Sequence, residues 1–177
     1  MNGRPQPNPS LAQLEEEARL RGLVLRLKLS RPAGLAWGLR VVVARRGHRA
    51  EPGAPLLLLG ELKGWAMPTH SGLRLDTLRV QGPDTTAVGP LIWAATFAWA
   101  LEATPCRSAR FLAIRDDARQ HRRLVRYFQR LGFEPVRELG AAAWDLPART
   151  VWGGAGLLMR GDCHEVLRRC GRRLELV

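Results

Sequence analysis

The segment Leu73-Arg-Leu-Asp-Thr-Leu-Arg-Val80 and the residues that follow it give the clearest indication of the fold of this chain. Its largely alternating apolar residues predict a strand, and the following residues 81–90 predict a loop rich in Gly, Pro and Thr. A hydrophobic helix is predicted over residues 91–103 and a second strand over residues 109–115. This order is typical of a parallel βαβ unit. A helix that opens just after Gly89 presents unpaired backbone N–H groups to the loop, which favours anion binding there.

Four segments of this region carry a resemblance: residues 75–80, the loop to Gly89, residues 111–115 and residues 124–133. Together they resemble the acyl-CoA-binding half of the GNAT N-acetyltransferase superfamily. The resemblance implies an α+β fold with a mixed, mostly antiparallel sheet flanked by helices, and a V-shaped opening between the strands at Leu73 and Ala109. It also implies transfer of an acyl group from acetyl-CoA, or another acyl-CoA, to an amine.

The same resemblance implies that CoA lies along residues 80–91, held by backbone N–H groups of the loop. The implied cofactor-binding residues are Leu78, Val80, Thr85, Thr86, Val88, Gly89, Leu91 and His121. The loop differs from the family pattern because Asp84 takes the place of a Gln or Arg, and Ala87 that of a Gly. A carboxylate repels a diphosphate, whereas the hydroxyls of Thr85 and Thr86 can donate hydrogen bonds to one.

Asp76 is the carboxylate of the strand 73–80 and is the candidate general base for the acceptor amine. Two alternatives stay open. Asp76 can instead form an ion pair with Arg74 or Arg79 of an adjacent strand, and Glu61 is a weaker candidate for the same role.

The proton donor to the departing thiolate is altered in this chain. Phe128 occupies the position where the family has a tyrosine, four residues before Gly132, and a phenyl ring has no proton to donate. Its neighbour Tyr127, about 100° around the helix, is the remaining candidate acid. We therefore predict Asp76 and Tyr127 as the catalytic pair.

A strong positive charge suggests a second function. The formal net charge is +12 and the sequence pI is near 11.4. Five arginines share one face of the helix predicted over residues 118–131: Arg119, Arg122, Arg123, Arg126 and Arg130. A high-GC genome, which encodes arginine where others encode lysine, explains the excess without any function. The lack of interleaved acidic residues on this helix face instead favours an anionic partner. The alternative function is therefore a non-catalytic module that binds RNA or the ribosome, an acidic protein or a membrane surface.

Composition predicts one domain over residues 10–177 after a disordered leader over residues 1–9. Three cysteines without a CxxC pair predict neither a disulfide framework nor a metal site, which fits the reducing cytoplasm. Neither a signal peptide nor a transmembrane segment is expected. The tryptophans fall mostly where a core needs them, as Trp93 and Trp99 do with Phe97, so no aromatic platform for RNA is predicted.

The remaining elements are predicted from hydrophobic periodicity and from capping and turn residues. Ser10 is expected to cap a first helix, and Asp116 or Asp117 to cap the helix over 118–131. Residues 45–49 are expected to form a solvated hairpin tip, with phosphate binding as the alternative. Strands are expected over 23–29, 35–44, 56–65, 133–139 and 150–159, the first three in an antiparallel meander, with a turn at 144–147 and a final helix over 162–170.

Overall fold

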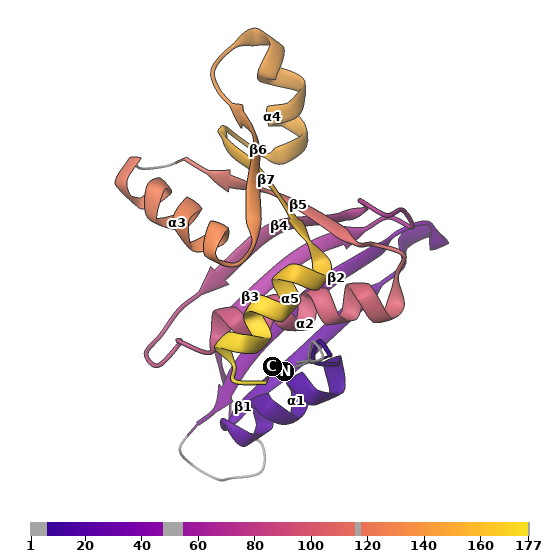
Figure 1. Cartoon of the computed structure of the whole chain (residues 1–177), viewed down its shortest axis with the longest axis vertical. Helices are drawn as coiled ribbons and strands as arrows, with labels where there is room; N and C mark the ends of the chain where they lie inside the picture. The colour runs from indigo at the N-terminus through magenta and orange to yellow at the C-terminus, as the bar shows by residue number, and fades with distance from the viewer. Residues whose placement is uncertain (1–6, 48–54, 116–117, 177) are drawn as a thin grey trace, which may run out of the picture.

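The computed structural model describes residues 7–47, 55–115 and 118–176, and its α+β class agrees with the sequence prediction (Figure 1). The capping predicted from Asp116 or Asp117, and part of the 45–49 tip and of the leader, lie outside the described residues. The elements in chain order are α1 (Leu11–Leu20), β1 (Leu23–Ser30), η1 (Pro32–Gly34), β2 (Trp37–Arg46), β3 (Leu56–Ala66), β4 (Leu73–Val80), α2 (Val88–Ala103), β5 (Ser108–Ile114), α3 (Ala118–Arg130), β6 (Phe133–Leu139), η2 (Ala143–Asp145), α4 (Leu146–Trp152), β7 (Gly156–Asp162) and α5 (Cys163–Arg173).

The strands form one mixed sheet in the order β1-β2-β3-β4-β5-β7-β6. β1 to β3 form the predicted antiparallel meander, which β4 extends, and β5, β7 and β6 also pair antiparallel. β4 and β5 pair in parallel, joined by the α2 crossover. The predicted βαβ unit is therefore confirmed, and it joins two antiparallel halves of the sheet.

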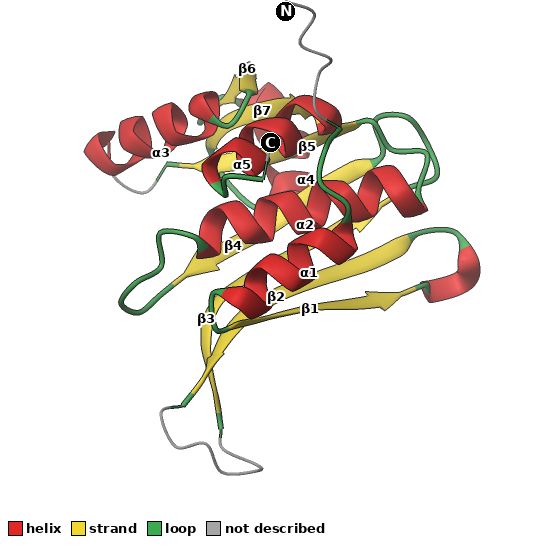
Figure 2. Ribbon diagram, turned by 60° about the horizontal axis from the view of Figure 1, so that its bottom comes forward, coloured by secondary structure: helices red, strands yellow, loops and turns green. Residues whose placement is uncertain are grey.

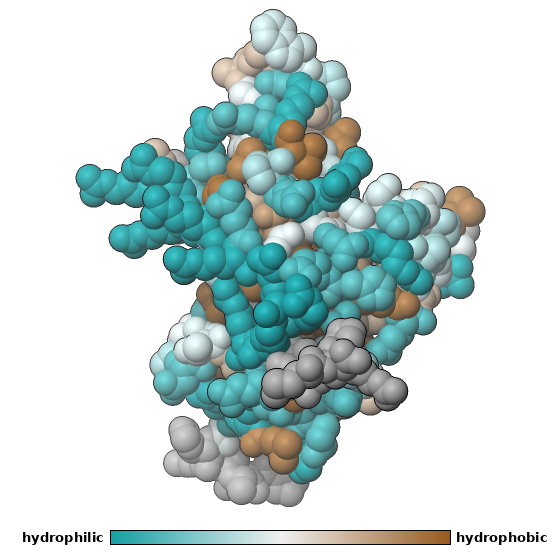
Figure 3. All heavy atoms as spheres, viewed as in Figure 1, coloured by the Kyte–Doolittle hydropathy of each residue, from teal (hydrophilic) through white to brown (hydrophobic). Residues whose placement is uncertain are grey.

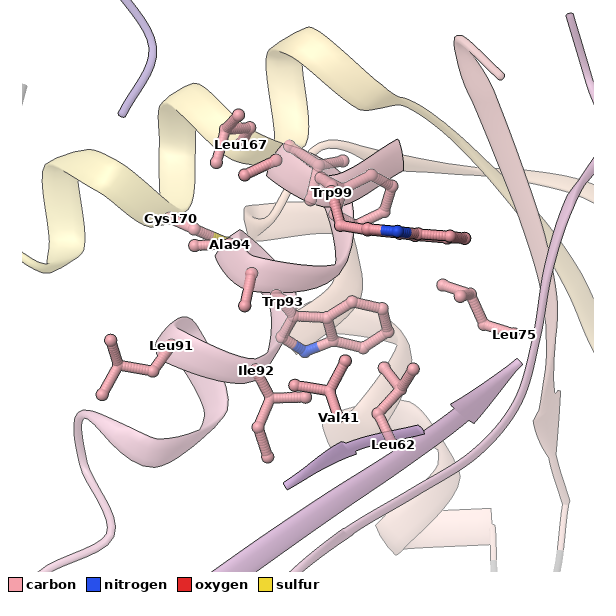
Figure 4. Close-up of a cluster of buried hydrophobic side chains, with 14 of the residues drawn as sticks. Val41, Leu62, Leu75, Leu91, Ile92, Trp93, Ala94, Trp99, Leu167 and Cys170 are labelled. Atoms are coloured by element: carbon pink, nitrogen blue, oxygen red, sulfur yellow. The ribbon is translucent and has the colours of Figure 1, made fainter. Parts of the chain in front are cut away.

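Helices α1 and α2 lie across the same face of the sheet (Figure 2). α2 is apolar on all sides because it is buried on all sides. Trp93 and Ile92 face Val41 and Leu62 of the sheet, whereas Ala94 lies beside Cys170 of α5 (Figure 4). The sheet face opposite α2 is the more open one. Successive side chains of a strand point to opposite faces, so the buried Val41 and Leu62 face α2 and the exposed Arg40 and Lys63 lie on the open face.

The parallel pairing between β4 and β5 is short. It joins Leu73 to Ala109 and Leu75 to Phe111 and goes no further, although both strands continue. Asp76 is the extra residue of a β-bulge, because Lys63 pairs with Thr77 while Gly64 pairs with Leu75. A bulge bends its strand and increases its twist. A Cβ at Gly64 would lie 2.5 Å from the Arg74 carbonyl oxygen, so the strand opposite the bulge needs glycine.

The C-terminal quarter corrects two sequence predictions. Residues 144–147 are not a turn but belong to η2 and the start of α4, and residues 150–152 are helical, so the last strand begins only at Gly156. Pro147 looks like a turn residue, but proline is also favoured in the first turn of a helix. Gly153, with φ +79°, ends α4 in the left-handed conformation.

The start of α2 is also earlier than predicted. The helix opens at Val88 and not after Gly89, so Gly89 and Pro90 lie within its first turn. Proline is compatible with this position because the first helical N–H groups have no intrahelical acceptor. α1 agrees with prediction: the Ser10 Oγ accepts from the Gln13 N–H at 3.2 Å, and Gln13 Oε1 accepts in return from the Ser10 N–H at 2.8 Å.

Candidate functional site

A cleft opens where β4 and β5 separate, on the side of the sheet that α2 and α3 cover. Its volume is about 380 Å³. Trp93, Phe111 and Phe128 contribute aromatic walls, and Leu78 and Leu124 extend the apolar lining. Because ordinary ligand pockets have volumes of about 300–1,000 Å³, the cleft can hold a small ligand or a narrow chain.

Two further cavities lie beside the same split, the place where β4 and β5 separate, on the opposite face of the sheet. One, of about 470 Å³, is bounded by polar residues of β1, β2 and β3, and the other, of about 340 Å³, by α4. Both are lined by Asp76 and Thr77, which also line the aromatic cleft. Asp76 and Thr77 are therefore the residues at which spaces on the two faces of the sheet meet.

Asp76 lies in this junction, but its carboxylate already has a partner. Arg74 Nε donates to Asp76 Oδ1 at 2.9 Å, so the predicted ion pair exists, within β4 and not across strands. The Arg74 guanidinium also lies 4.3 Å from the centre of the Trp152 ring and donates to the Val151 carbonyl oxygen. Arg74 thus ties the candidate base to α4.

Glu61, the weaker candidate base, is engaged more fully. Arg40 Nε lies 2.5 Å and Lys63 Nζ 3.5 Å from Glu61 Oε1. Burial opposes ionisation, but these two cations outweigh it and hold the pKa of Glu61 below its ordinary value. A carboxylate of lowered pKa is a weak proton acceptor, so Glu61 is a poor candidate for the base.

The backbone of β4 beyond the split offers hydrogen-bond donors. The Gln81 N–H donates to the Leu59 carbonyl oxygen of β3. Since successive N–H groups of a strand point to opposite edges, the N–H groups of Leu78 and Val80 point toward β5, from which β4 has already separated. These two predicted residues therefore face the opening through their backbone.

The predicted phosphate loop leads to the start of α2. The N–H groups of Thr86, Ala87 and Gly89 donate no backbone hydrogen bond within the described residues. Asp84 is largely exposed and lies 3.9 Å from Arg45. The predicted ligands Val88 and Leu91 have side chains in the core, so only their backbone is open to a ligand.

Tyr127 lies at the start of α2 and not in the aromatic cleft. Its hydroxyl is 3.0 Å from the position of a Cβ built on Gly89, and Arg173 Cζ lies 5.7 Å from its ring centre. Burial, with a contribution from Cys170, raises the pKa of Tyr127, although Trp93 and Arg173 oppose this. The Trp93 indole N–H lies near but lacks the geometry of a hydrogen bond. Tyr127 is thus a protonated O–H donor beside the α2 N-terminus.

Phe128 and His121 complete the predicted residues of α3. Phe128 lines the cleft and packs against Phe111, with ring centres 4.4 Å apart. His121 Nδ1 lies 3.2 Å from the Ile114 carbonyl oxygen, at the end of β5. The structure therefore brings Asp76, Leu78 and Phe128 to one cleft and sets Tyr127, Thr85 and Thr86 near α2.

The arginine face of α3 is exposed. Figure 3 shows hydrophilic side chains projecting where α3 lies in Figure 1. Ion pairs are absent, among the described residues, for Arg122, Arg123, Arg126 and Arg130. Arg169 of α5 donates to the Gln129 carbonyl oxygen at 3.3 Å, so the basic residues of α5 adjoin this surface.

The prediction that the tryptophans mostly serve the core holds for only half of them. Trp93 and Trp99 are buried and Trp37 packs against the core, but Trp152 is half-buried, and Trp65 and Trp144 are exposed. Trp65 lines the polar cavity on the open face of the sheet together with Lys28, Arg40 and Lys63. Sequence reasoning missed this group, although the alternation of β3 places Trp65 and Lys63 on the same face.

Over the described part of the chain, no cluster of three or more metal-ligating side chains is present, and no helix is long and apolar enough to cross a membrane. Cys106, Cys163 and Cys170 are free and buried, and burial raises the pKa of Cys163 and of Cys170 to about 12. Comparison with models of known protein families matched none of them, and comparison with curated proteins found no similar one.

Proposed function

We propose that this protein is a divergent GNAT-type acyltransferase that moves an acyl group from acetyl-CoA, or another acyl-CoA, to an amine. One observation carries the proposal: β4 and β5 separate after Leu75, and spaces on both faces of the sheet meet at Asp76 and Thr77. A thioester that enters from the α2 side and an amine on the opposite face can meet there. The buried free cysteines fit a cytoplasmic protein.

The diphosphate of CoA is expected at the start of α2. The free N–H groups of Ala87 and Gly89, the Tyr127 hydroxyl and the Arg173 charge converge there. This assigns Tyr127 to binding, because it does not line the aromatic cleft. The pantetheine chain would then run along the open edge of β4 into that cleft, with the N–H groups of Leu78 and Val80 available to its amides.

The chemistry needs few groups. The amine nitrogen forms a bond to the thioester carbonyl carbon, the carbon–sulfur bond breaks, and CoA leaves as a thiolate. The proton of the amine passes to Asp76, directly or through water, and the thiolate takes a proton from water. Holding the two reactants in place supplies much of the acceleration, and a β4 N–H supplies stabilisation of the oxyanion.

Thermal unfolding with acetyl-CoA tests the proposal. Acetyl-CoA at about 100 times its Kd stabilises a protein by about 2.7 kcal/mol, which raises Tm by about 5–10 °C at this chain length. Leu78→Trp, which fills the cleft, should abolish the shift, while Leu29→Trp at an exposed site of β1 should retain it. An unchanged Tm in the unmodified protein would overturn the proposal.

The unpaired arginines of α3 favour a second candidate, a module that binds a nucleic acid. Their charges are exposed, and no described residue forms an ion pair with them. Such a face releases counterions when it binds a polyanion, so affinity falls steeply with salt.

Fluorescence anisotropy with a single-stranded RNA oligonucleotide over a salt series tests this module. Replacing the four unpaired arginines by glutamine (Arg122, Arg123, Arg126 and Arg130) should reduce the salt slope by about three units, at about 0.7 per charge. The control carries the same charge change at exposed positions elsewhere (Arg26, Arg46, Arg110 and Arg160). Equal losses in the two variants would show that net charge alone drives binding.

A further inference from the structure

The open face of the sheet beside Asp76 carries positive charges in an ordered row. In the antiparallel register Lys28 lies opposite Arg40, and Arg40 lies opposite Lys63. Like charges directly opposite one another destabilise a sheet, so this row costs stability. Its three side chains line the same cavity of about 470 Å³ that reaches Asp76 and Thr77.

The carboxylates near this row do not neutralise it. Glu61 contacts both Arg40 and Lys63, so one negative charge is shared by two positive ones. Asp76 is paired with Arg74. Lys28 forms no ion pair with any described residue. The cavity therefore keeps a net positive charge, and Trp65, 45% exposed, adds an aromatic wall.

We propose that the acceptor is a small primary amine that also carries a carboxylate or phosphate group, and that the row of Lys28, Arg40 and Lys63 binds that anionic group. This inference rests on the acyltransferase function proposed above. Lys63 lies opposite Thr77 in the register, so the row ends at the split. Neighbouring strands are about 4.8 Å apart, which sets the distance from the amine to the anion at about 5–10 Å.

The row has a second consequence for the chemistry. Only the neutral amine attacks a thioester, and nearby cations disfavour the ammonium form of an amine. A substrate anchored by its anion thus has its amine placed where protonation is least favoured. This reduces the work required of Asp76, whose carboxylate is held by Arg74.

Four short amines test the inference: 3-aminopropyl phosphate, 4-aminobutyrate, n-butylamine and 1,4-diaminobutane. Binding is measured by calorimetry without acetyl-CoA, and turnover is measured with it. The two anionic amines should bind and should exceed n-butylamine at least tenfold in kcat/KM, with the diamine weakest. Comparison of the phosphate with the carboxylate identifies the preferred anion.

Variants separate binding from folding. Lys63→Gln should weaken binding of the anionic amines about tenfold, whereas Arg130→Gln on α3, with the same charge change, should not. Lys28→Glu places a carboxylate opposite Arg40, so it should raise Tm and weaken binding. These opposite signs exclude a purely structural role for the row.

The outcomes distinguish the two proposals. Turnover of n-butylamine or the diamine as fast as that of the anionic amines would overturn this inference and leave the acyltransferase function supported. Binding of the anionic amines without turnover of any amine would overturn the acyltransferase function and support the anion site. Absence of both binding and turnover would overturn both.

Discussion

Tyr127 and Phe128 are neighbours in sequence, but their side chains point to different parts of the molecule. Phe128 lines the aromatic cleft at the split, and Tyr127 reaches the first turn of α2. The resemblance to acetyltransferases pointed to one tyrosine as a proton donor, and adjacency alone made Tyr127 its substitute. Because residues one apart on a helix differ by about 100° in direction, Tyr127 faces the start of α2 and not the cleft.

Phe128→Tyr is therefore expected to restore a proton donor to the cleft. If CoA leaves there, kcat should rise about tenfold, since general acid catalysis contributes about 100-fold or more when fully positioned. Tyr127→Phe is the matched control and should raise the KM for acetyl-CoA without lowering kcat. Steady-state kinetics at saturating amine separates the two. A loss of kcat in Tyr127→Phe, with no gain in Phe128→Tyr, would return the acid role to Tyr127.

Among the elements, the local sequence of α2 agrees with its structure, whereas the local sequence of α4 does not. α2 is apolar on every side, a pattern that fits only burial between other layers, and its place between the sheet and α5 agrees. α4 is a short helix whose Thr150 and Val151 favour a strand by propensity. Asp145, before it, accepts from the Gly140 N–H at 2.9 Å and also binds Arg137, which holds the η2–α4 segment against β6.

The attachment of η2 and α4 should depend on pH. The Gly140 hydrogen bond, opposed by burial and aided by Arg137, holds the pKa of Asp145 below its ordinary value of 3.8. A lowered pKa in the folded state contributes stability above the unfolded value, and that contribution is lost as pH falls through the folded value. The Tm difference between the unmodified protein and Asp145→Asn should thus be full above about pH 5 and shrink toward pH 3. A constant difference across this range would contradict the assignment.

The whole molecule carries a net charge of +12, which repels itself in the compact state. Its ion pairs are mostly local and surface-exposed, such as Arg19 with Glu16, and such pairs contribute little. Long-range repulsion is therefore the larger electrostatic effect on stability. The same excess gives the two cationic surfaces, the α3 face and the Lys28–Arg40–Lys63 row, their attraction for anions.

Added salt is expected to stabilise this protein. The Debye length falls from about 14 to about 6 Å between 0.05 and 0.3 M NaCl. Because this screens the repulsion, Tm should rise by a few degrees. Sodium sulfate at equal ionic strength should raise Tm further, because sulfate is excluded from the protein surface in addition to screening charge. A falling Tm in NaCl would mean that the ion pairs, such as Glu61 with Arg40, outweigh the repulsion.

Much of the fold could be predicted because short stretches of sequence specify many of its strands and helices. Alternation identified β1 and β4, and apolar runs identified β2 and β3. A continuous apolar run identified α2, and a period of about 3.6 residues identified α3. Ser10 identified the start of α1 through its own side chain. The structure also locates the candidate residues Asp76 and Leu78 at the opening between β4 and β5, which only the family resemblance implied.

The sequence by itself determined most of the strands and helices, but not α4, and it determined which side chains alternate on the strands. Only the tertiary structure decided that Asp76 is a bulge, that Lys28, Arg40 and Lys63 stand in one row, and that Tyr127 faces α2 and not the cleft. The physical reason is range. Period and capping depend on residues a few positions apart, whereas register and packing depend on partners far away in the chain, which no local pattern specifies.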